Sequence, residues 1–206
     1  MSPVRVKICG LRRSQDVAAV VQAGADAVGF VFAPVSPRCV EVEAAAVLCR
    51  QVPAFIARVG LFLDQEAEYV RSVLQRVPLS LLQFHGREDA AYCRQFGLPY
   101  VKAVSMASAD PVATAEAAFA DAAGILVDSH QPGEPGGTGR QVDWNRITVS
   151  RLPLILAGGL CPDNVRSAVK MVRPWAVDVS SGVESAPGIK DEGAIRRFIQ
   201  EAKSEQ

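Results

Sequence analysis

Two acidic side chains stand at the ends of apolar runs, where they could transfer protons. Cys9 closes the run Val-Lys-Ile-Cys at residues 6–9, and Asp128 closes the run Ile-Leu-Val-Asp at residues 125–128. A thiol that ionises is a good base or nucleophile. A carboxylate is costly to bury, so we expect Asp128 to face an open site. The alternatives are that Cys9 is a small buried hydrophobic residue and that Asp128 caps or holds the following loop.

Glycine- and serine-rich segments follow the later apolar runs, at residues 136–139, 158–159 and 180–182. Glycine lets a ligand approach the backbone closely, and successive N–H groups can point at one anion. These segments predict a phosphate-binding region formed by six residues, namely Gly137, Gly158, Gly159, Ser180, Ser181 and Gly182.

Three further side chains are candidates for binding a substrate. Arg38 lies in the loop after the second apolar run, where its planar guanidinium suits a carboxylate or a phosphate. Gln83 and His85 flank the end of the fourth run, and His85 is an alternative general base. The ordinary alternative for Arg38 is a solvated arginine in a loop. For His85, and also for His130, it is a histidine hydrogen-bonded to the backbone.

The composition favours one soluble enzyme-sized domain over residues 1–206, with hydrophobic residues making up 49%. The 22 basic and 22 acidic residues leave no basic excess, so nucleic acid and membrane are not expected as partners. Two histidines and five scattered cysteines predict neither a metal site nor a disulfide framework. We therefore expect a cytoplasmic protein, and a monomer and a homodimer both stay open.

Eight short apolar runs predict strands that alternate with helical segments, at residues 4–9, 27–32, 57–62, 79–84, 100–104, 124–128, 154–157 and 176–179. Continuous apolar runs are typical of parallel strands buried on both faces. Eight repeats predict a single (β/α)₈ barrel, the TIM barrel. The competing doubly wound sheet usually has a glycine-rich turn after its first strand, but Gly10 is followed by Leu-Arg-Arg.

Strand and helix periodicity also place individual residues. Alternation puts Lys7 on the same face as Cys9, so Lys7 needs a partner, and Asp178 on the last strand is the nearest candidate for a structural pair. Lys102 is compatible with a Schiff-base aldolase only if it points inward. Ser14 and Asp64 are the expected N-caps of the first and third helices.

The order and spacing of these segments resemble the phosphoribosylanthranilate isomerase family over almost the whole chain. The segments that carry the resemblance are residues 7–11 (Lys-Ile-Cys-Gly-Leu), 24–26 (Gly-Ala-Asp), 29–32 (Gly-Phe-Val-Phe), 36–38 (Ser-Pro-Arg), 83–86 (Gln-Phe-His-Gly), 127–129 (Val-Asp-Ser), 136–139 (Gly-Gly-Thr-Gly), 157–160 (Ala-Gly-Gly-Leu), 163–165 (Asp-Asn-Val), 178–184 (Asp-Val-Ser-Ser-Gly-Val-Glu), 187–188 (Pro-Gly) and 190–191 (Lys-Asp).

The resemblance implies an Amadori rearrangement of N-(5-phosphoribosyl)anthranilate that needs neither metal nor cofactor. It implies that Cys9 is the general base, that Asp128 is the general acid and that Arg38 binds the carboxylate of anthranilate. Two departures are Cys39, where an aromatic residue is common, and Cys161, where a hydroxyl residue is common. The rivals are a histidine-pathway or dual-substrate isomerase, which uses two aspartates, and a non-catalytic phosphate-binding barrel.

Overall fold

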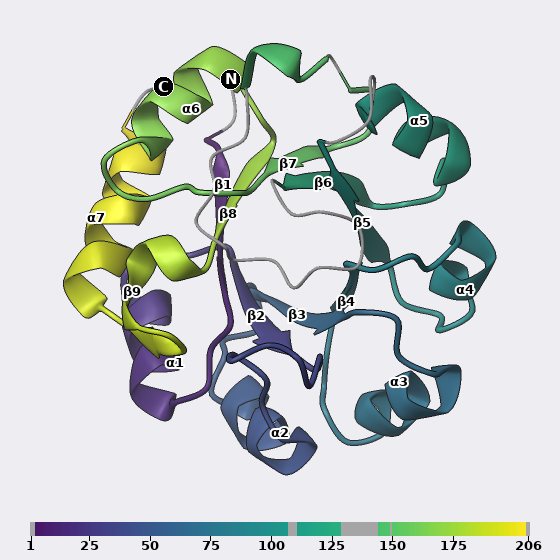
Figure 1. Ribbon diagram of the computed structural model, residues 1–206. Coiled ribbons are helices and arrows are strands. Elements are labelled where there is room, and N and C mark those ends of the chain that lie inside the picture. The colour runs from purple at the N-terminus through teal and green to yellow at the C-terminus, as the bar shows by residue number, and fades with distance from the viewer. Residues whose placement is uncertain (1–2, 107–110, 129–143, 149, 205–206) are drawn as a thin grey trace.

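The structure, a computed structural model, describes residues 3–106, 111–128, 144–148 and 150–204, and Gly137 and His130 lie outside these ranges. Its strands form a closed barrel in chain order, β1 to β8, and every neighbouring pair is parallel. Figure 1 looks along the barrel and shows the helices around it as an outer ring. The predicted TIM barrel is confirmed.

All eight predicted strands are present in the barrel. Their bounds are β1 Arg5–Cys9, β2 Ala27–Val31, β3 Ala57–Phe62, β4 Leu81–Phe84, β5 Tyr100–Ser105, β6 Gly124–Asp128, β7 Leu154–Leu156 and β8 Ala176–Val179. The largest difference from the sequence-based bounds is at β4, which begins two residues later than expected. The turn before β4 contains Pro78, which has no N–H to donate to a neighbouring strand.

The helices alternate with the strands as expected, with one difference among the described residues. Between β6 and β7 these residues contain only the short 3₁₀ helix η1. The bounds are α1 Ser14–Gln22, α2 Val42–Arg50, α3 Ala67–Leu74, α4 Ala90–Arg94, α5 Pro111–Ala118, η1 Trp144–Arg146, α6 Val165–Val172, η2 Ser181–Val183 and α7 Glu192–Lys203. A small antiparallel hairpin, β9 Glu184–Ala186 and β10 Ile189–Lys190, precedes α7.

The strands alternate between two separate cores. Val6 and Ile8 of β1 pack outward into the large cluster between sheet and helices. Val101 and Ala103 of β5 belong instead to a smaller cluster inside the barrel. This alternation follows from the period of two in a strand. It leaves the barrel interior to the other set of side chains, which at β1 includes Cys9.

Two of the expected helix caps are wrong. Ser14 is the first residue of α1, whose N-cap is Arg13, and the Ser14 hydroxyl accepts a hydrogen bond from Gln51. Asp64 lies two residues before Glu66, the N-cap of α3, and accepts from the backbone N–H of Arg87. Both polar side chains bond to a neighbouring loop or helix, so tertiary contacts decided their partners.

The hairpin β9–β10 folds Lys190 back towards the barrel before α7 begins. Asp191 caps α7 by accepting a hydrogen bond from the N–H of Ala194, which explains where the last helix starts. Among the described residues, no helix is long and apolar enough to cross a membrane.

Candidate active site

A cavity of about 60 Å³ lies at the carboxyl ends of the strands, and it has one apolar and one polar wall. The apolar wall is formed by Val31, Ala33, Leu61 and Leu63, the first two of which pack with Cys9. The other lining residues are Cys9, Ser36, Arg38, Gln83, His85, Asp128, Asp178 and Ser180. In a barrel of this type the active site lies at this end of the strands.

Cys9 faces the cavity from the end of β1, as the strand alternation predicts. The neighbouring residue on β2 is Gly29, where a Cβ would stand 2.7 Å from the Cys9 Sγ. Glycine at this position therefore makes room for the thiol. Burial raises the pKa of Cys9 above its usual range, and the nearby Lys7 ammonium partly offsets this effect.

The predicted pairing of Lys7 with Asp178 is confirmed. The two residues stand side by side on β1 and β8, and the Lys7 Nζ donates to both carboxylate oxygens at 2.9 and 3.0 Å. Burial lowers the pKa of Lys7, but Asp178 and Cys9 more than offset this, so that the pKa is raised and the ammonium persists. The pair therefore holds the Lys7 ammonium in a fixed position, and its Asp178 carboxylate lines the cavity.

Asp128 ends β6 and lies next to His85, with 3.6 Å between its Oδ2 and the histidine Nε2. The other ring nitrogen, Nδ1, is 3.2 Å from the Gln83 Nε2. The His85 Nε2 atom faces the Asp128 carboxylate. His85, at the end of β4, thus lies beside the Asp128 carboxylate at the mouth of the barrel, although β5 stands between their two strands.

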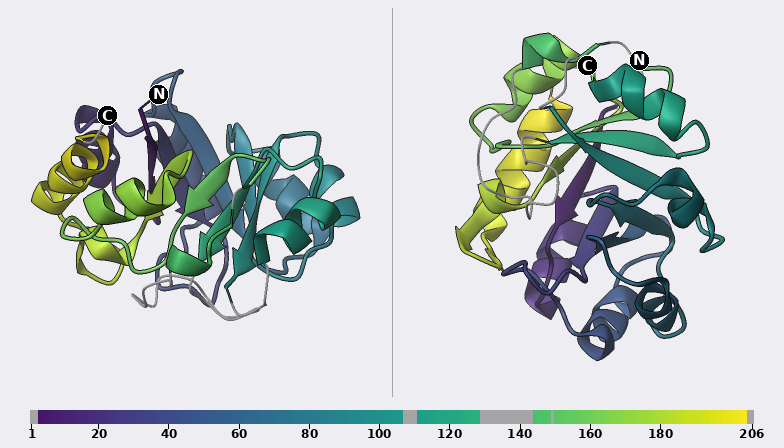
Figure 2. Two further views of the ribbon diagram at one scale, coloured as in Figure 1. Left: turned by 90° about the horizontal axis from the view of Figure 1, so that it is seen from above. Right: turned by 45° about the vertical axis from the view of Figure 1, so that its right-hand side comes forward.

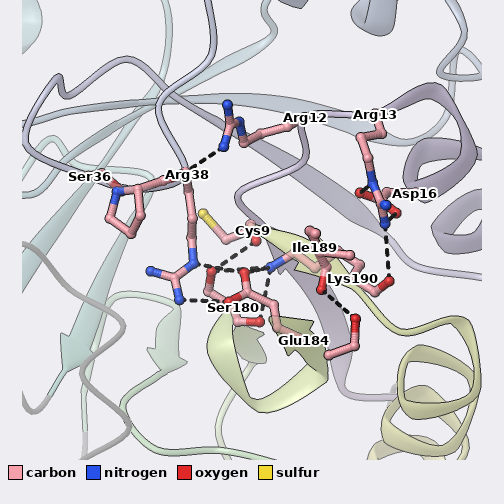
Figure 3. Close-up of polar contacts among 12 residues, drawn as sticks. Cys9, Arg12, Arg13, Asp16, Ser36, Arg38, Ser180, Glu184, Ile189 and Lys190 are labelled. Carbon is pink, nitrogen blue, oxygen red and sulfur yellow. Dashed lines mark hydrogen bonds and ion pairs between the residues drawn. The ribbon is translucent and has the colours of Figure 1, made fainter. Parts of the chain in front are cut away.

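Arg38 is buried in an ion pair that the sequence analysis missed (Figure 3). Its Nε and Nη2 donate to the two carboxylate oxygens of Glu184, each at 2.8 Å, and Lys190 donates to the same carboxylate at 2.8 Å. Burial raises the pKa of Glu184, but the two cations more than offset this, and the pKa lies below its usual range. The carboxylate therefore holds the guanidinium at the rim of the cavity.

The same cluster also contacts the turn after β8. The Ser180 hydroxyl donates to the carbonyl of Cys9 at 3.0 Å, and Lys190 donates to the Ser180 carbonyl at 3.0 Å (Figure 3). Glu184 and Lys190 were not among the expected site residues. The acid that follows the turn 180–182 and the next lysine along the chain are the signals that could have identified them.

The predicted glycine turns after β7 and β8 lie against each other. Gly158 and Gly159 have φ values of +81° and +67°, a region that glycine enters without strain. A Cβ on Gly182 would stand 1.9 Å from the carbonyl oxygen of Leu160, so close packing between the two turns requires glycine there. The carbonyl of Gly159 accepts from the side chain of Asn164, which precedes α6.

The direction of the Lys102 side chain resolves another sequence-based alternative. Lys102 pairs with Glu88 at 3.0 Å and has the ring of Phe119 near it, on the helix side of the barrel wall. It does not line the cavity, so the aldolase alternative is wrong. Cys39 is also absent from the residues lining the cavity. In the described part of the chain, no group of three or more possible metal ligands occurs.

The closed barrel and the ionisable groups at its mouth define a (β/α)₈ barrel with a site suited to acid–base chemistry. Residues 6–201 match the family model described as N-(5′-phosphoribosyl)anthranilate (PRA) isomerase. An N-(5′-phosphoribosyl)anthranilate isomerase of Thiobacillus denitrificans is 54% identical over 203 residues, which are 98% of each chain.

Solved structures agree with this match. A phosphoribosyl anthranilate isomerase in complex with reduced 1-(o-carboxyphenylamino)-1-deoxyribulose 5-phosphate is 39% identical, with a TM-score of 0.83 over 98% of this chain and 99% of that one. Monomers generated from the dimeric enzyme of Thermotoga maritima are 38% identical, with a TM-score of 0.82 and the same coverage. This chain belongs to the phosphoribosylanthranilate isomerase family, and it is an isomerase of tryptophan biosynthesis.

Proposed function

We propose that the protein converts N-(5′-phosphoribosyl)anthranilate into 1-(2-carboxyphenylamino)-1-deoxyribulose 5-phosphate, with Cys9 as general base and Asp128 as general acid. The observation that carries this proposal is that both side chains line one cavity, although they come from β1 and β6. A base and an acid on one small cavity can act on the same sugar. The relative that holds the reduced product analogue supports the choice of substrate.

The reaction requires two proton transfers that these residues can perform. Asp128 donates a proton to the ring oxygen as the C1–O bond of the furanose breaks, which leaves a protonated Schiff base between C1 and the anthranilate nitrogen. The Cys9 thiolate then removes the proton from C2, and the electrons of that C–H bond form an enolamine. Loss of the enol proton and protonation at C1 give the ketone, so the isomerisation is redox-neutral.

The two walls of the cavity suit the two parts of anthranilate. The benzene ring packs against the apolar wall of Val31, Ala33, Leu61 and Leu63. Arg38 binds the carboxylate. Its pair with Glu184 occupies two of the five N–H donors of the guanidinium, and the others can donate to the substrate. Gln83 and His85 line the cavity beside Asp128 and bind the substrate there.

The phosphate lies at the turns after β7 and β8. Backbone N–H groups of Gly158, Gly159, Ser180, Ser181 and Gly182 hold it, with the region of Gly137 as a further contact outside the described residues. The positive φ values of the first two support this role, since such turns present successive N–H groups to an anion. Barrels of this fold frequently bind phosphate at these two loops.

The decisive experiment is a fluorescence assay with the purified protein. Freshly made phosphoribosylanthranilate should lose its fluorescence on mixing, and the Cys9→Ala and Asp128→Asn proteins should each react far more slowly. A histidine-pathway substrate tests the alternative, which uses two aspartates and is disfavoured by the thiol at Cys9. Turnover of that substrate alone would contradict the proposal, as would binding of phosphosugars without any turnover.

The protein forms a homodimer through the amino-terminal face of the barrel in this proposal. Phe55 is fully exposed, at 102%, and it borders a cavity of about 430 Å³ on that face, together with the half-exposed Trp175. The loop between α2 and β3 projects on the side where the N-terminus lies (Figure 2, left). A projection beside a cavity is self-complementary under a two-fold axis, and a relative is dimeric.

The remaining expectations concern the chain as a whole. The match over residues 6–201 supports one barrel domain over residues 1–206. A cytoplasmic location is supported by the five cysteines, all of which are free thiols. Cell fractionation with an antibody against the native protein tests the location, and recovery in a secreted fraction would contradict it.

A further inference from the structure

Lys7 stands one layer below Cys9 on the same face of β1, inside the barrel. Its side chain is only 9% exposed, as is that of its partner Asp178. A hydrophobic pair would fill this position without burying two charges, and replacing buried ion pairs by apolar residues is often neutral or stabilising. The charge at Lys7 therefore calls for an explanation beyond filling the barrel.

The neighbour that would use this charge is Cys9. Lys7 and Cys9 lie two residues apart on the same face of β1, and the Lys7 charge favours the ionised form of the thiol. A cation next to a thiol favours the thiolate, which is the form that a general base must have. Asp178 acts in the opposite direction on Cys9, and its attraction for Lys7 also fixes where the ammonium lies.

Other elements packed around Cys9 bring further charges near it. Lys190, on the hairpin before α7, also favours the thiolate, although it is bonded to Glu184 and Ser180. The remaining charged or titratable side chains around the cavity are Arg38 after β2, His85 after β4 and Asp128 on β6. Lys7 is the cation with the largest effect on Cys9, and it also shares its strand.

We propose that Lys7 is a positioning residue that stabilises the thiolate of Cys9, and that Asp178 holds Lys7 in place while opposing part of its effect. This inference rests on the proposed role of Cys9 as the base. It gives the buried pair a function in the reaction, and it predicts that the two members of the pair shift the ionisation of Cys9 in opposite directions.

The test is the pH dependence of the alkylation of Cys9 by iodoacetamide, followed by mass spectrometry of the peptide that contains it. Only the thiolate attacks, forming the S–C bond as iodide leaves. Lys7→Met should move the midpoint to higher pH and slow alkylation at a fixed pH below it by about tenfold, the effect of one unit in pKa. Asp178→Asn should move the midpoint to lower pH.

A matched control comes from the second buried lysine pair. Lys102 is 3.0 Å from Glu88 on the helix side of the barrel wall, and neither residue lines the cavity with Cys9. Lys102→Met removes a buried charge in the same way, so its alkylation midpoint should stay at the parent value. Lys7→Arg keeps the positive charge and should stay closer to the parent than Lys7→Met.

The pH profile of kcat/KM separates this inference from the role of Cys9. The limb that rises with pH should move with the alkylation midpoint in Lys7→Met, with kcat falling more than KM changes. An unchanged alkylation midpoint in Lys7→Met would overturn the inference even if activity fell. Full activity of Cys9→Ala would instead remove the base from the mechanism, while alkylation of the Lys7 variants would still test the charge effect.

Lys7→Met leaves the carboxylate of Asp178 buried without its partner, which can prevent folding. The double variant Lys7→Met/Asp178→Asn removes both charges and serves in that case. Its alkylation midpoint should lie above that of Asp178→Asn alone. Equal midpoints in these two proteins would contradict an effect of Lys7 on the thiolate.

Discussion

The two ends of the barrel differ in the size of their cavities and in the residues that line them, and the larger cavity is not the candidate active site. The cavity at the carboxyl ends is about 60 Å³, whereas the one at the amino ends is about 430 Å³. The small cavity is bordered by the thiol, carboxylates and guanidinium, and the large one has Phe55 and Trp175 at its edge together with Arg5, Lys7 and Asp26. We propose that the chemistry takes place in the small cavity, where Cys9 and Asp128 meet, and that the larger cavity takes a protein partner.

Strand β1 links the two ends and illustrates the difference. Arg5 borders the amino-terminal cavity, where its guanidinium stacks on Trp175 at 4.5 Å, and Cys9 borders the other cavity four residues later. Lys7 lies between them with its charge compensated inside the barrel. One short strand thus presents a surface contact, a buried charge and a reactive thiol in sequence.

The largest effect is expected from removing the base at the carboxyl end. Cys9→Ala should lower kcat by about 10²- to 10⁴-fold, the usual contribution of a general base, with little change in product affinity. Steady-state kinetics and product-inhibition measurements test this. Cys93→Ala, which changes a cysteine buried among the helices, is the control and should keep its kcat. Near-normal turnover by Cys9→Ala would exclude the thiol from the mechanism.

A similar loss is expected when the acid is replaced without changing its shape. Asp128→Asn cannot protonate the ring oxygen, so kcat should fall by about 10²-fold or more and ring opening should become limiting. The parent's pH–rate profile should have two limbs, one for the protonated acid and one for the ionised base. The limb that falls with pH should disappear in Asp128→Asn. A profile identical to the parent's would assign Asp128 a structural role.

A smaller effect is expected at the phosphate-binding turns. Gly159→Val should raise KM and weaken inhibition by inorganic phosphate, because the side chain would take space near the phosphate oxygens. The φ of +67° adds a strain of about 1 kcal/mol or more. Gly97→Val has a similar φ of +70° in open space away from the cavity and controls for strain. An unchanged KM in a folded Gly159→Val protein would place the phosphate elsewhere.

A substitution on the amino-terminal face should change the oligomeric state of the protein and not the rate of the chemical step. Phe55→Asp should convert the dimer to a monomer, since the charge could not enter the apolar part of a partner's cavity, while kcat stays within about twofold of the parent's. Light scattering coupled to size-exclusion chromatography measures this. Val47→Asp on the exposed side of α2 is the control and should leave the mass unchanged. A monomeric parent protein would contradict the proposed dimer.

The smallest effect concerns the acid stability of the Arg38 cluster. The pKa of Glu184 is lowered in the fold, so its ion pairs stabilise the protein above the unfolded pKa of about 4.3 and lose this effect as pH falls through the folded value. Glu184→Gln should therefore be less stable than the parent at pH 7. The difference in unfolding free energy should shrink below about pH 4. A pH-independent difference in urea titrations would contradict this linkage.

Much of the site could be predicted from local patterns. The strand period predicts that Lys7 and Cys9 share one face of their strand, and the pairing of Lys7 with Asp178 follows from closing the barrel. These predictions succeeded because each depends on the direction of a side chain from its own strand and on the order of strands that parallel connections impose.

Other features depended on contacts that no local pattern encodes. Arg38 meets Glu184 across 146 positions in the chain, and Lys190 reaches the same carboxylate only because the hairpin β9–β10 turns back. Asp64 and Ser14 have the chemistry of helix caps, yet each bonds to a neighbouring segment. A polar side chain takes the partner that packing brings within reach, and its propensity decides only where no such partner is available.

The sequence by itself determined the class of barrel, the end of it that carries the site and the residue types available for proton transfer. Only the tertiary structure decided which of those side chains are compensated by a partner and on which side of the wall Lys102 lies. The physical reason is range. Hydrophobic periodicity acts within a few residues, whereas the charge state of a buried group depends on all the charges that the closed barrel brings around it.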